Sequence, residues 1–251
     1  MAALRVATYN IHKGLSLFNR RVVIHELRDR LRELNADLVF LQEVVGRHDR
    51  HAARHHNWPA APQHEFLADL VWPDHAYGKN AADDNGEHGN ALLSRYPITR
   101  WENQDVSSHR FEKRGLLHCE IEVPGWSAPL HCVCVHLALT ARGRSWQLER
   151  LRQRIERLVP ADAPLIVAGD FNDWYWRRRA THEFAHPLNM HEVFETDSGG
   201  LPARSFPAML PMLRLDRIYV RGFRVHNTRV HRGRGWRMSD HVALTSELER
   251  L

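Results

Sequence analysis

The sequence has few cysteines for its length and places none of them in a loop. Its 251 residues include three, Cys119, Cys132 and Cys134, all within apolar, strand-like segments. This excludes the disulfide framework of small secreted domains, and we expect reduced thiols in a hydrophobic core. Cys132, Cys134 and His136 share one face of a predicted strand, but Cys-x-Cys-x-His lacks the spacing of a structural zinc site. Packing is therefore the preferred interpretation of these cysteines.

The sequence also lacks a long apolar run and a secretory signal. Its first ten residues enter a strand-like pattern directly, without a cationic stretch, an apolar stretch and a cleavage site. No run is long and apolar enough to cross a bilayer. We therefore expect a cytoplasmic protein, and we expect it to be monomeric.

Neither apolar nor charged residues are in excess. Apolar residues make up 43% and charged residues 26% of the chain, as in ordinary globular proteins. A chain of 251 residues is long enough for one large α/β domain and too short for two, so we expect residues 1–251 to form a single domain. The net charge of +5 favours polyanionic partners, such as nucleic acid or anionic lipid head groups.

Apolar periodicity predicts a fold of the α/β class. Runs rich in β-branched residues predict strands at 4–9, 37–42, 90–94, 116–123, 130–136, 164–169, 216–220 and 242–248. Helical spacing predicts two helices, whose apolar faces contain Ile24, Leu27, Leu31 and Leu34 in the first and Leu148, Leu151, Ile155 and Leu158 in the second. This order of elements predicts two packed mixed β-sheets flanked by helices. Long connections are predicted at 44–64, 76–89, 99–114, 174–214 and 227–239.

Polar residues stand where the predicted strands meet loops, namely Asn10, Glu43, His136, Asp170, Asn172, Asp216, Asp240 and His241. A capping or turn-forming role would explain any one of them, but so many at strand ends indicate a shared cleft. Their carboxylates are hard oxygen donors, which favours Mg²⁺, Mn²⁺ or Ca²⁺ over zinc. Asp170 and Asn172 alternate onto one side, so that a base and an amide can face one phosphate while Phe171 turns toward the core.

These residues belong to segments that resemble the endonuclease/exonuclease/phosphatase superfamily in order and spacing. The segments are Thr8-Tyr-Asn-Ile-His, Leu41-Gln-Glu-Val, Val135-His-Leu, Ala168-Gly-Asp-Phe-Asn-Asp, Leu215-Asp-Arg-Ile-Tyr-Val and Met238-Ser-Asp-His. Ser-Asp-His alone is a weak motif, whereas the ordered set is specific. Similarity to the bacterial YbhP-like branch rests on Asn10-Ile-His-Lys-Gly, Phe18-Asn-Arg-Arg, His88-Gly-Asn-Ala-Leu-Leu-Ser-Arg-Tyr-Pro-Ile and Arg214-Leu-Asp-Arg-Ile-Tyr-Val.

The resemblance implies a four-layer α/β sandwich with a Mg²⁺-dependent hydrolytic site at one end of the two sheets. It implies metal binding by Glu43 with Asn10 and Asp240 beside it, phosphate binding by Asn172 and His136, and a paired His241 and Asp216. Asp170 would hold or deprotonate the attacking water. Whether His241 or Asp170 is the general base stays open, and we favour electrostatic stabilisation by His241. Arg114 is either an additional phosphate ligand or part of a surface salt bridge.

Three patches rich in arginine and aromatic residues adjoin this predicted site. They comprise Arg47 to His56, then Trp174, Trp176, Arg177 and Arg178, and finally the segment from Arg229 that includes Arg234 and Trp236. Such patches stack on bases and bind phosphate backbones, which predicts a nuclease with little sequence specificity, acting on DNA. Solvated loops are the alternative interpretation of each patch.

Two other functions remain open from the sequence. One is a phosphatase or phosphodiesterase acting on inositol phosphates, phosphoinositides or phospholipid head groups, in which residues 206–213 contact lipid rather than pack in the core. The other is a non-catalytic nucleic-acid-binding module, which would leave the carboxylates at the strand ends without a role. Repair of abasic sites is disfavoured, because His136-Leu-Ala-Leu replaces the Tyr-x-Pro-Asn of the superfamily's abasic-site endonucleases.

Overall fold

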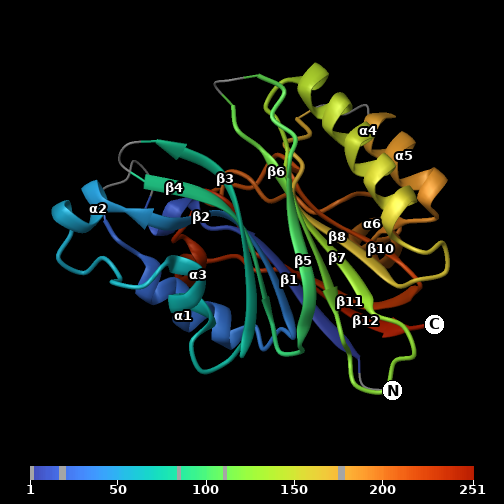
Figure 1. The fold of residues 1–251 in the computed structure, drawn as a ribbon, viewed down its shortest axis with the longest axis horizontal. Helices are drawn as coiled ribbons and strands as arrows, with labels where there is room; N and C mark the ends of the chain where they lie inside the picture. The colour runs from blue at the N-terminus through green and yellow to red at the C-terminus, as the bar shows by residue number, and fades with distance from the viewer. Residues whose placement is uncertain (1–2, 17–20, 84–85, 110–111, 175–178) are drawn as a thin grey trace.

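The computed structural model of the chain describes residues 3–16, 21–83, 86–109, 112–174 and 179–251. These residues form two six-stranded β-sheets that stack face to face (Figure 1). The first sheet contains, in spatial order, β11 (Phe223–Val230), β12 (Leu244–Arg250), β1 (Leu4–Asn10), β2 (Leu38–His48), β4 (Gly86–Ser94) and β3 (Asp74–Asp83). The second contains β5 (Ile98–Asp105), β6 (Gly115–Ile121), β7 (Leu130–His136), β8 (Leu165–Asp170), β10 (Asp216–Arg221) and β9 (His191–Glu192).

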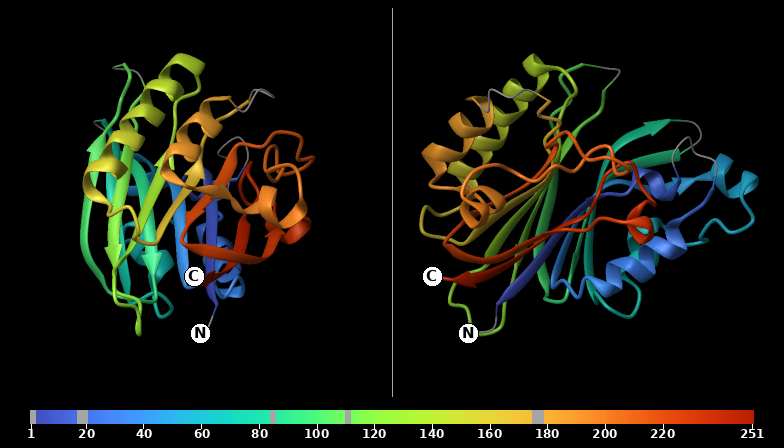
Figure 2. Two further views of the ribbon diagram at one scale, coloured as in Figure 1. Left: turned by 90° about the vertical axis from the view of Figure 1, so that its right-hand side faces the viewer. Right: turned by 180° about the vertical axis from the view of Figure 1, so that it is seen from behind.

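Helices cover the outer faces of both sheets. On the first sheet lie α1 (Ile24–Glu33) and α3 (Gln63–Ala68), and on the second lie α4 (Ala141–Leu158) and α5 (Arg179–Ala185), as Figures 1 and 2 show. The remaining helices are α2 (Asp49–Arg54), α6 (Val193–Ser198) and the 3-10 turns η1 (His12–Gly14), η3 (His186–Leu188) and η4 (Arg234–Trp236). The predicted four-layer α/β sandwich is confirmed.

Three apolar layers hold the sandwich together. The inner one lies between the sheets and contains Val6 and Ile166, whereas Val39 packs with Leu27 of α1 on the outer face of the first sheet. A third layer joins the second sheet to Leu151 of α4. Because successive strand residues point to opposite faces, every second residue of an interior strand enters the inner layer.

The three cysteines are buried free thiols in the inner layer. Burial raises the pKa of the Cys134 thiol to about 12, so it stays protonated at neutral pH. Its Sγ lies 3.4 Å from the backbone oxygen of Leu41, which brings the two sheets into contact at this point. The interpretation of the cysteines as packing residues is therefore confirmed.

The eight predicted strands are the eight interior strands of the two sheets, whereas the edge strands β3, β5, β9 and β11 were missed. The predictions of continuous connections at 76–89, 99–114, 174–214 and 227–239 were wrong for this reason, and the segment 44–64 likewise contains the end of β2 and all of α2. An edge strand pairs on one side only and can expose most of its side chains, as β5 does. It therefore needs no continuous apolar run.

Both chain termini lie at one end of the sandwich, which is the lower end in Figure 1 and again in both views of Figure 2. β1 therefore starts at this end and delivers Asn10 to the opposite one. Among the residues that the structure describes, no helix combines the length and the hydropathy needed to cross a membrane.

Gly169 in β8 permits the close approach of β7, and its replacement tests the packing of the second sheet. Its φ is +148°, and a Cβ atom there would lie 1.9 Å from the backbone oxygen of Val135. We predict that Gly169→Ala lowers the free energy of unfolding by at least about 2 kcal/mol, because the two strands must move apart. Denaturant unfolding measures this change. Gly200→Ala is the control, since nothing lies within 4 Å of its added atom, and equal losses in both variants would contradict the prediction.

Candidate active site

Four strands place polar side chains at the same end of the inner layer. Asn10, His136, Asp170 and Asp216 are buried and continue the inward-facing series of β1, β7, β8 and β10. Strand register aligns His136 with Asp170 and Asp170 with Asp216 across the second sheet. Asn10 approaches from the first sheet, with its Nδ2 atom 3.1 Å from Oδ2 of Asp170. The predicted convergence of these four residues is thus present.

Glu43 reaches the same place through an irregularity in β2. In a regular strand it would face the helices, as Val39 and Leu41 do. The pairing of β2 with β4 shifts between Leu41 and Val44, and Glu43 takes a φ of +56°. This bulge turns its carboxylate toward Asn10, whose Nδ2 lies 3.4 Å from Oε1 of Glu43. β-Bulges often redirect a side chain beside an active site.

His241 lies between two buried carboxylates. Its Nδ1 donates to Oδ2 of Asp216 at 2.8 Å, and its Nε2 lies 3.6 Å from Oδ2 of Asp170. Burial lowers the pKa of His241, but the charges of Asp216, Asp170 and Asp240 outweigh it and raise the pKa to about 10. Burial and the charge of Asp216 raise the pKa of Asp170 to about 7, against the opposing effect of His241. His241 is therefore an imidazolium at neutral pH.

His136 is a second histidine at Asp170, in the opposite charge state. Its Nε2 lies 3.7 Å from Oδ2 of Asp170. Burial, with the positive charges of Arg114 and His241, holds the pKa of His136 well below its usual value. A neutral and a charged imidazole therefore flank one carboxylate, and only the neutral ring can both donate and accept hydrogen bonds.

Asp240 and Glu43 both face His12, which the sequence interpretation assigned no role. Nδ1 of His12 lies 3.5 Å from Oδ1 of Asp240 and 4.0 Å from Oε2 of Glu43. The Ser239 hydroxyl, also missed, donates to the backbone oxygen of Asn10 at 2.7 Å and lies 3.2 Å from Oδ1 of Asp240. Both missed residues stand inside the motifs Asn10-Ile-His and Ser239-Asp-His, so inspection of every polar motif member would have found them.

Two predicted phosphate donors already bind backbone groups. The backbone N–H of Asn172 donates to Oδ1 of Asp170 at 2.9 Å. The side-chain Nδ2 of Asn172 donates to the backbone oxygen of Leu137, also at 2.9 Å. Nε of Arg114 donates to the same Leu137 oxygen at 3.1 Å, and its Nη2 lies 3.2 Å from Oε1 of Glu112. A salt bridge of Arg114 is therefore present, but with side chains 13% and 12% accessible it is mostly buried rather than at the surface, and this contact restricts the guanidinium.

Among the converging polar residues that the structure describes, two groups of side chains could hold a divalent cation. The buried Asp170, Asp216 and His241 each place a ligand atom within 4.8 Å of the others, but the imidazolium already offsets the charge of one of the two carboxylates. Glu43 and Asp240 are partly exposed, with side chains 22% and 21% accessible. Hard carboxylate oxygens that water can reach suit Mg²⁺, which keeps several water ligands. The donor chemistry of this second group therefore fits the cation that the sequence predicted.

The side-chain amide of Asn10 is oriented differently from that expected of a metal ligand. Its Oδ1 accepts a hydrogen bond from the backbone amide of His12 at 3.1 Å, while its Nδ2 faces Asp170 and Glu43. In this orientation Asn10 bridges the two carboxylates as a shared donor. To offer oxygen to a cation, its amide group would have to turn over.

The patches predicted to bind substrate differ in their contacts. Trp174 is 40% exposed, and its ring centroid lies 6.0 Å from that of Phe206, which in turn lies 5.0 Å from that of His241. Trp236 instead packs on Tyr9 at the edge of the core, with ring centroids 6.3 Å apart. Outside the described residues lie Trp176, Arg177 and Arg178, and the side chain of Arg234 is likewise not described.

The first patch, from Arg47 to His56, makes contacts within itself. Arg47 lies 2.7 Å from Asp49, and the rings of His48 and His51 are 3.7 Å apart. His51 stacks on Trp58 with ring centroids 5.0 Å apart. These contacts agree with the alternative interpretation in that the side chains pack on one another, although the segment forms the end of β2 and the helix α2 rather than a loop.

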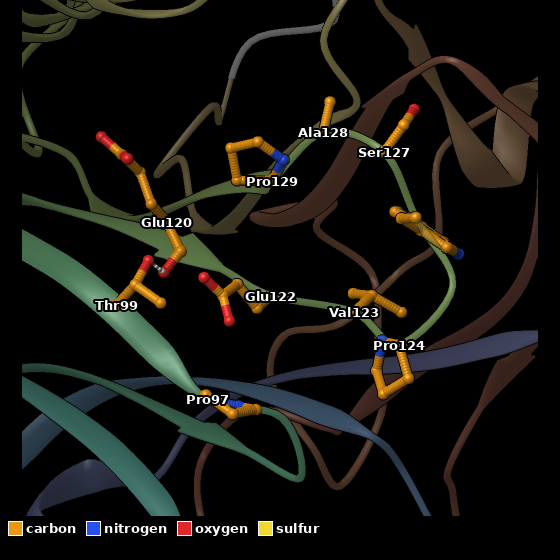
Figure 3. A pocket seen from close by; sticks show the side chains of 10 residues that line it. Pro97, Thr99, Glu120, Glu122, Val123, Pro124, Ser127, Ala128 and Pro129 are labelled. Atoms are coloured by element: carbon orange, nitrogen blue, oxygen red, sulfur yellow. Dashed lines mark hydrogen bonds between the residues drawn. The ribbon is translucent and has the colours of Figure 1, made fainter.

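A cavity of about 540 Å³ lies at the end of the sandwich opposite the converging polar residues, around the turn between β6 and β7. Figure 3 shows Glu120 and Glu122 at its wall, together with Pro97 and Pro124. Thr99 donates to the backbone oxygen of Glu120 at 3.3 Å. The carboxylates of Glu120 and Glu122 would repel a phosphate. No predicted site residue that the structure describes lines this cavity, so it is not the phosphate site.

Comparison with known proteins finds a matching family model and a relative of high identity. The model of the endonuclease/exonuclease/phosphatase family matches residues 7–241. The chain is 47% identical over 247 residues to YbhP of Escherichia coli K12, covering 98% of this chain and 96% of YbhP.

Solved structures share the fold at lower identity. A Beutenbergia cavernae endonuclease/exonuclease/phosphatase superposes with a TM-score of 0.81 at 20% identity, covering 100% of this chain and 72% of that one. The human nocturnin catalytic domain with bound sulfate gives 0.77 at 18% identity, covering 100% and 94%. A Bacteroides thetaiotaomicron mannosyl-6-phosphatase gives 0.71 at 16% identity, covering 98% and 99%. At these identities the likeness shows the fold alone.

We predict that Asp216→Asn lowers the pKa of His241, because the Asp216 carboxylate is the largest of the charges that raise it. In the metal-free wild type the ring should stay protonated from about pH 6 to pH 9, whereas in the variant it should lose its proton within this range. Side-chain ¹H–¹⁵N NMR titration measures the change. Glu249→Gln, which removes the partner of the exposed His226, is the control. A His241 titration that is unchanged by Asp216→Asn would refute the assignment.

Proposed function

Because this chain belongs to the endonuclease/exonuclease/phosphatase family, we propose that it is a Mg²⁺-dependent phosphodiesterase that hydrolyses phosphate esters by in-line attack of water. Its fold is that of the family's phosphodiesterases and phosphatases, which are hydrolases acting on phosphate esters. One observation carries the proposal: the buried Asp170 carboxylate meets Asn10, His136 and His241 from three other segments of the chain.

The roles of the residues follow from their charge states. Asp170, with a pKa raised to about 7, is suited to orient water and accept its proton near neutral pH. His241, fixed by Asp216 and charged, would donate to a phosphate oxygen as negative charge develops there. This assigns proton transfer to Asp170 and charge stabilisation to His241.

Glu43 and Asp240 would hold the cation, with Asn10 beside them. When bound, Mg²⁺ would supply positive charge to the phosphate and the leaving oxygen. Neutral His136 can donate one hydrogen bond to a phosphate oxygen without repelling a cation. The second amide hydrogen of Asn172 is left for the same purpose, since one hydrogen already binds Leu137. No covalent intermediate with the protein is required.

For the substrate we propose nucleic acid, with DNA as the first choice. The net charge of +5 favours a polyanion. The half-exposed Trp174 stands beside Phe206 next to the charged His241, where an aromatic ring can stack on a base whose phosphate occupies the site. The sulfate bound to the nocturnin domain supports binding of a tetrahedral oxyanion by this fold.

A second candidate substrate is a phosphorylated lipid or inositol head group. The turn formed by residues 206–213 is closed by hydrogen bonds between Phe206 and Leu213 and exposes Met209, Leu210 and Met212. They are 64%, 67% and 56% accessible, whereas Ala208 of the same turn packs in the inner layer, so only part of the turn packs in the core. Apolar side chains beside a phosphate site suit an amphiphilic substrate.

We predict that Asp170→Asn and His241→Ala each lower the turnover number by at least about 100-fold, because each removes a group that acts on the reacting phosphate or water. Circular dichroism and thermal unfolding must first show that the variants are folded. Asp162→Asn and His226→Ala change exposed side chains and should leave turnover within about twofold of the wild type. Near-normal rates in a folded Asp170→Asn variant would contradict the role of this carboxylate.

The substrate choice is tested with an activity panel of plasmid DNA, single-stranded DNA, RNA, a generic phosphodiester and phosphoinositides. We expect Mg²⁺ to support activity and EDTA to abolish it, with DNA cleavage falling steeply as salt rises. Trp174→Ala should reduce cleavage of DNA more than that of the generic diester. A salt-insensitive preference for phosphoinositides that is reduced by Leu210→Ser would instead establish the second candidate. Undiminished activity in EDTA would refute metal dependence.

A further inference from the structure

His64, Glu65 and His75 form a cluster of potential metal ligands away from the residues assigned to catalysis. His64 and Glu65 lie in the first turn of α3, and His75 lies in β3. Each offers one ligand atom, and these atoms all lie within 4.8 Å of one another. Nε2 of His64 is 3.9 Å from Oε1 of Glu65, and the two imidazole centroids are 5.3 Å apart.

The burial and the hydrogen bonding of the His64 ring suit a metal ligand. Its side chain is 12% accessible, and Nδ1 is buried without a hydrogen bond to any residue that the structure describes. Burial, with the nearby His75, lowers the pKa of His64 to about 4, so the ring is neutral and keeps a lone pair for coordination. Tyr77 stacks on this ring at 4.6 Å with an interplanar angle of 2°, which fixes its plane.

We propose that His64, Glu65 and His75 form a binding site for a transition-metal ion, with Zn²⁺ as the expected occupant. Two imidazoles and one carboxylate are a common donor set for zinc, which takes about 2.0–2.2 Å bonds and a tetrahedral geometry, with water in the fourth position. Glu65 is 50% accessible at its side chain and can rotate to close the remaining separation. The nitrogen donors distinguish this site from the carboxylate pair of Glu43 and Asp240.

The position of the cluster connects it to the catalytic segments. Gln63, the residue before His64, accepts a hydrogen bond from the amide of Val45 at 2.9 Å and donates to the backbone oxygen of Lys13 at 2.8 Å. Val45 follows the bulge at Glu43, and Lys13 follows His12. An ion that joins α3 to β3 therefore fixes the turn that supports both segments. The binding proposal itself does not depend on the proposed function.

The location of the ion is tested by soaking crystals of the wild-type protein in Zn²⁺ and collecting data on both sides of the zinc absorption edge. We expect an anomalous difference peak within bonding distance of His64, Glu65 and His75. Peaks confined to the catalytic carboxylates, or to the histidines of the Arg47 to His56 patch, would overturn the proposal. This experiment needs no variant and is independent of enzymatic activity.

Calorimetric titration with Zn²⁺ tests the same site in solution. We expect His75→Gln, and separately Glu65→Gln, to lose one binding event or to weaken it at least about tenfold, because a ligand is removed. His226→Gln, which removes an exposed imidazole on β11, is the matched control and should retain the event. Thermal unfolding without metal confirms that the variants are folded. Equal stoichiometry and affinity in all four proteins would refute the site.

Discussion

The face-to-face packing of the two sheets is the constraint on which the active site depends. Side chains that point inward from both sheets share one apolar layer, and a polar residue that continues such a series at its end must lie at the mouth of that layer. Asp170 and Asp216 do so from neighbouring strands of one sheet, and Asn10 does so from the other. No loop has to fold precisely for these three groups to meet, since their strands already fix them.

The electrostatics of the site follow from this burial. Burial of a carboxylate costs free energy unless the charge is paired. His241 supplies a positive partner, because its protonated ring lies between Asp216 and Asp170. The imidazolium offsets the charge of one of the two buried carboxylates, and the partly exposed Glu43 and Asp240 add two further carboxylates, with the His12 ring at 3.5 to 4.0 Å. A phosphate that approaches the carboxylates of Glu43 and Asp240 in the absence of a cation is repelled. Binding of a cation by Glu43 and Asp240 before the substrate would therefore remove this repulsion.

The sequence predicts what periodicity controls and misses what irregular backbone controls. Interior strands are buried on both faces and show as continuous apolar runs, so all eight were predicted, whereas the edge strand β5 exposes polar residues and was not. Asp170 and Asp216 were predictable because a polar residue at the last or the first position of an apolar strand is conspicuous. The route of Glu43 to the site was not, because a bulge with a φ of +56° reverses the face that simple alternation predicts.

The distinction between regular strands and irregular connections also separates the proposed chemistry of this protein from its choice of substrate. In the proposed function the reacting groups stand on strand ends, whose positions the pairing of β7, β8 and β10 fixes. Trp174 and the turn that exposes Met209, Leu210 and Met212 stand on connections around those ends, where side chains can change without disturbing the inner layer. An aromatic ring and an apolar turn beside one charged imidazole make opposite demands on a substrate, since one favours a stacked base and the other an acyl chain. Under the proposed function, the relative contributions of Trp174 and Leu210 to binding would therefore decide which substrate the groups at the strand ends act on.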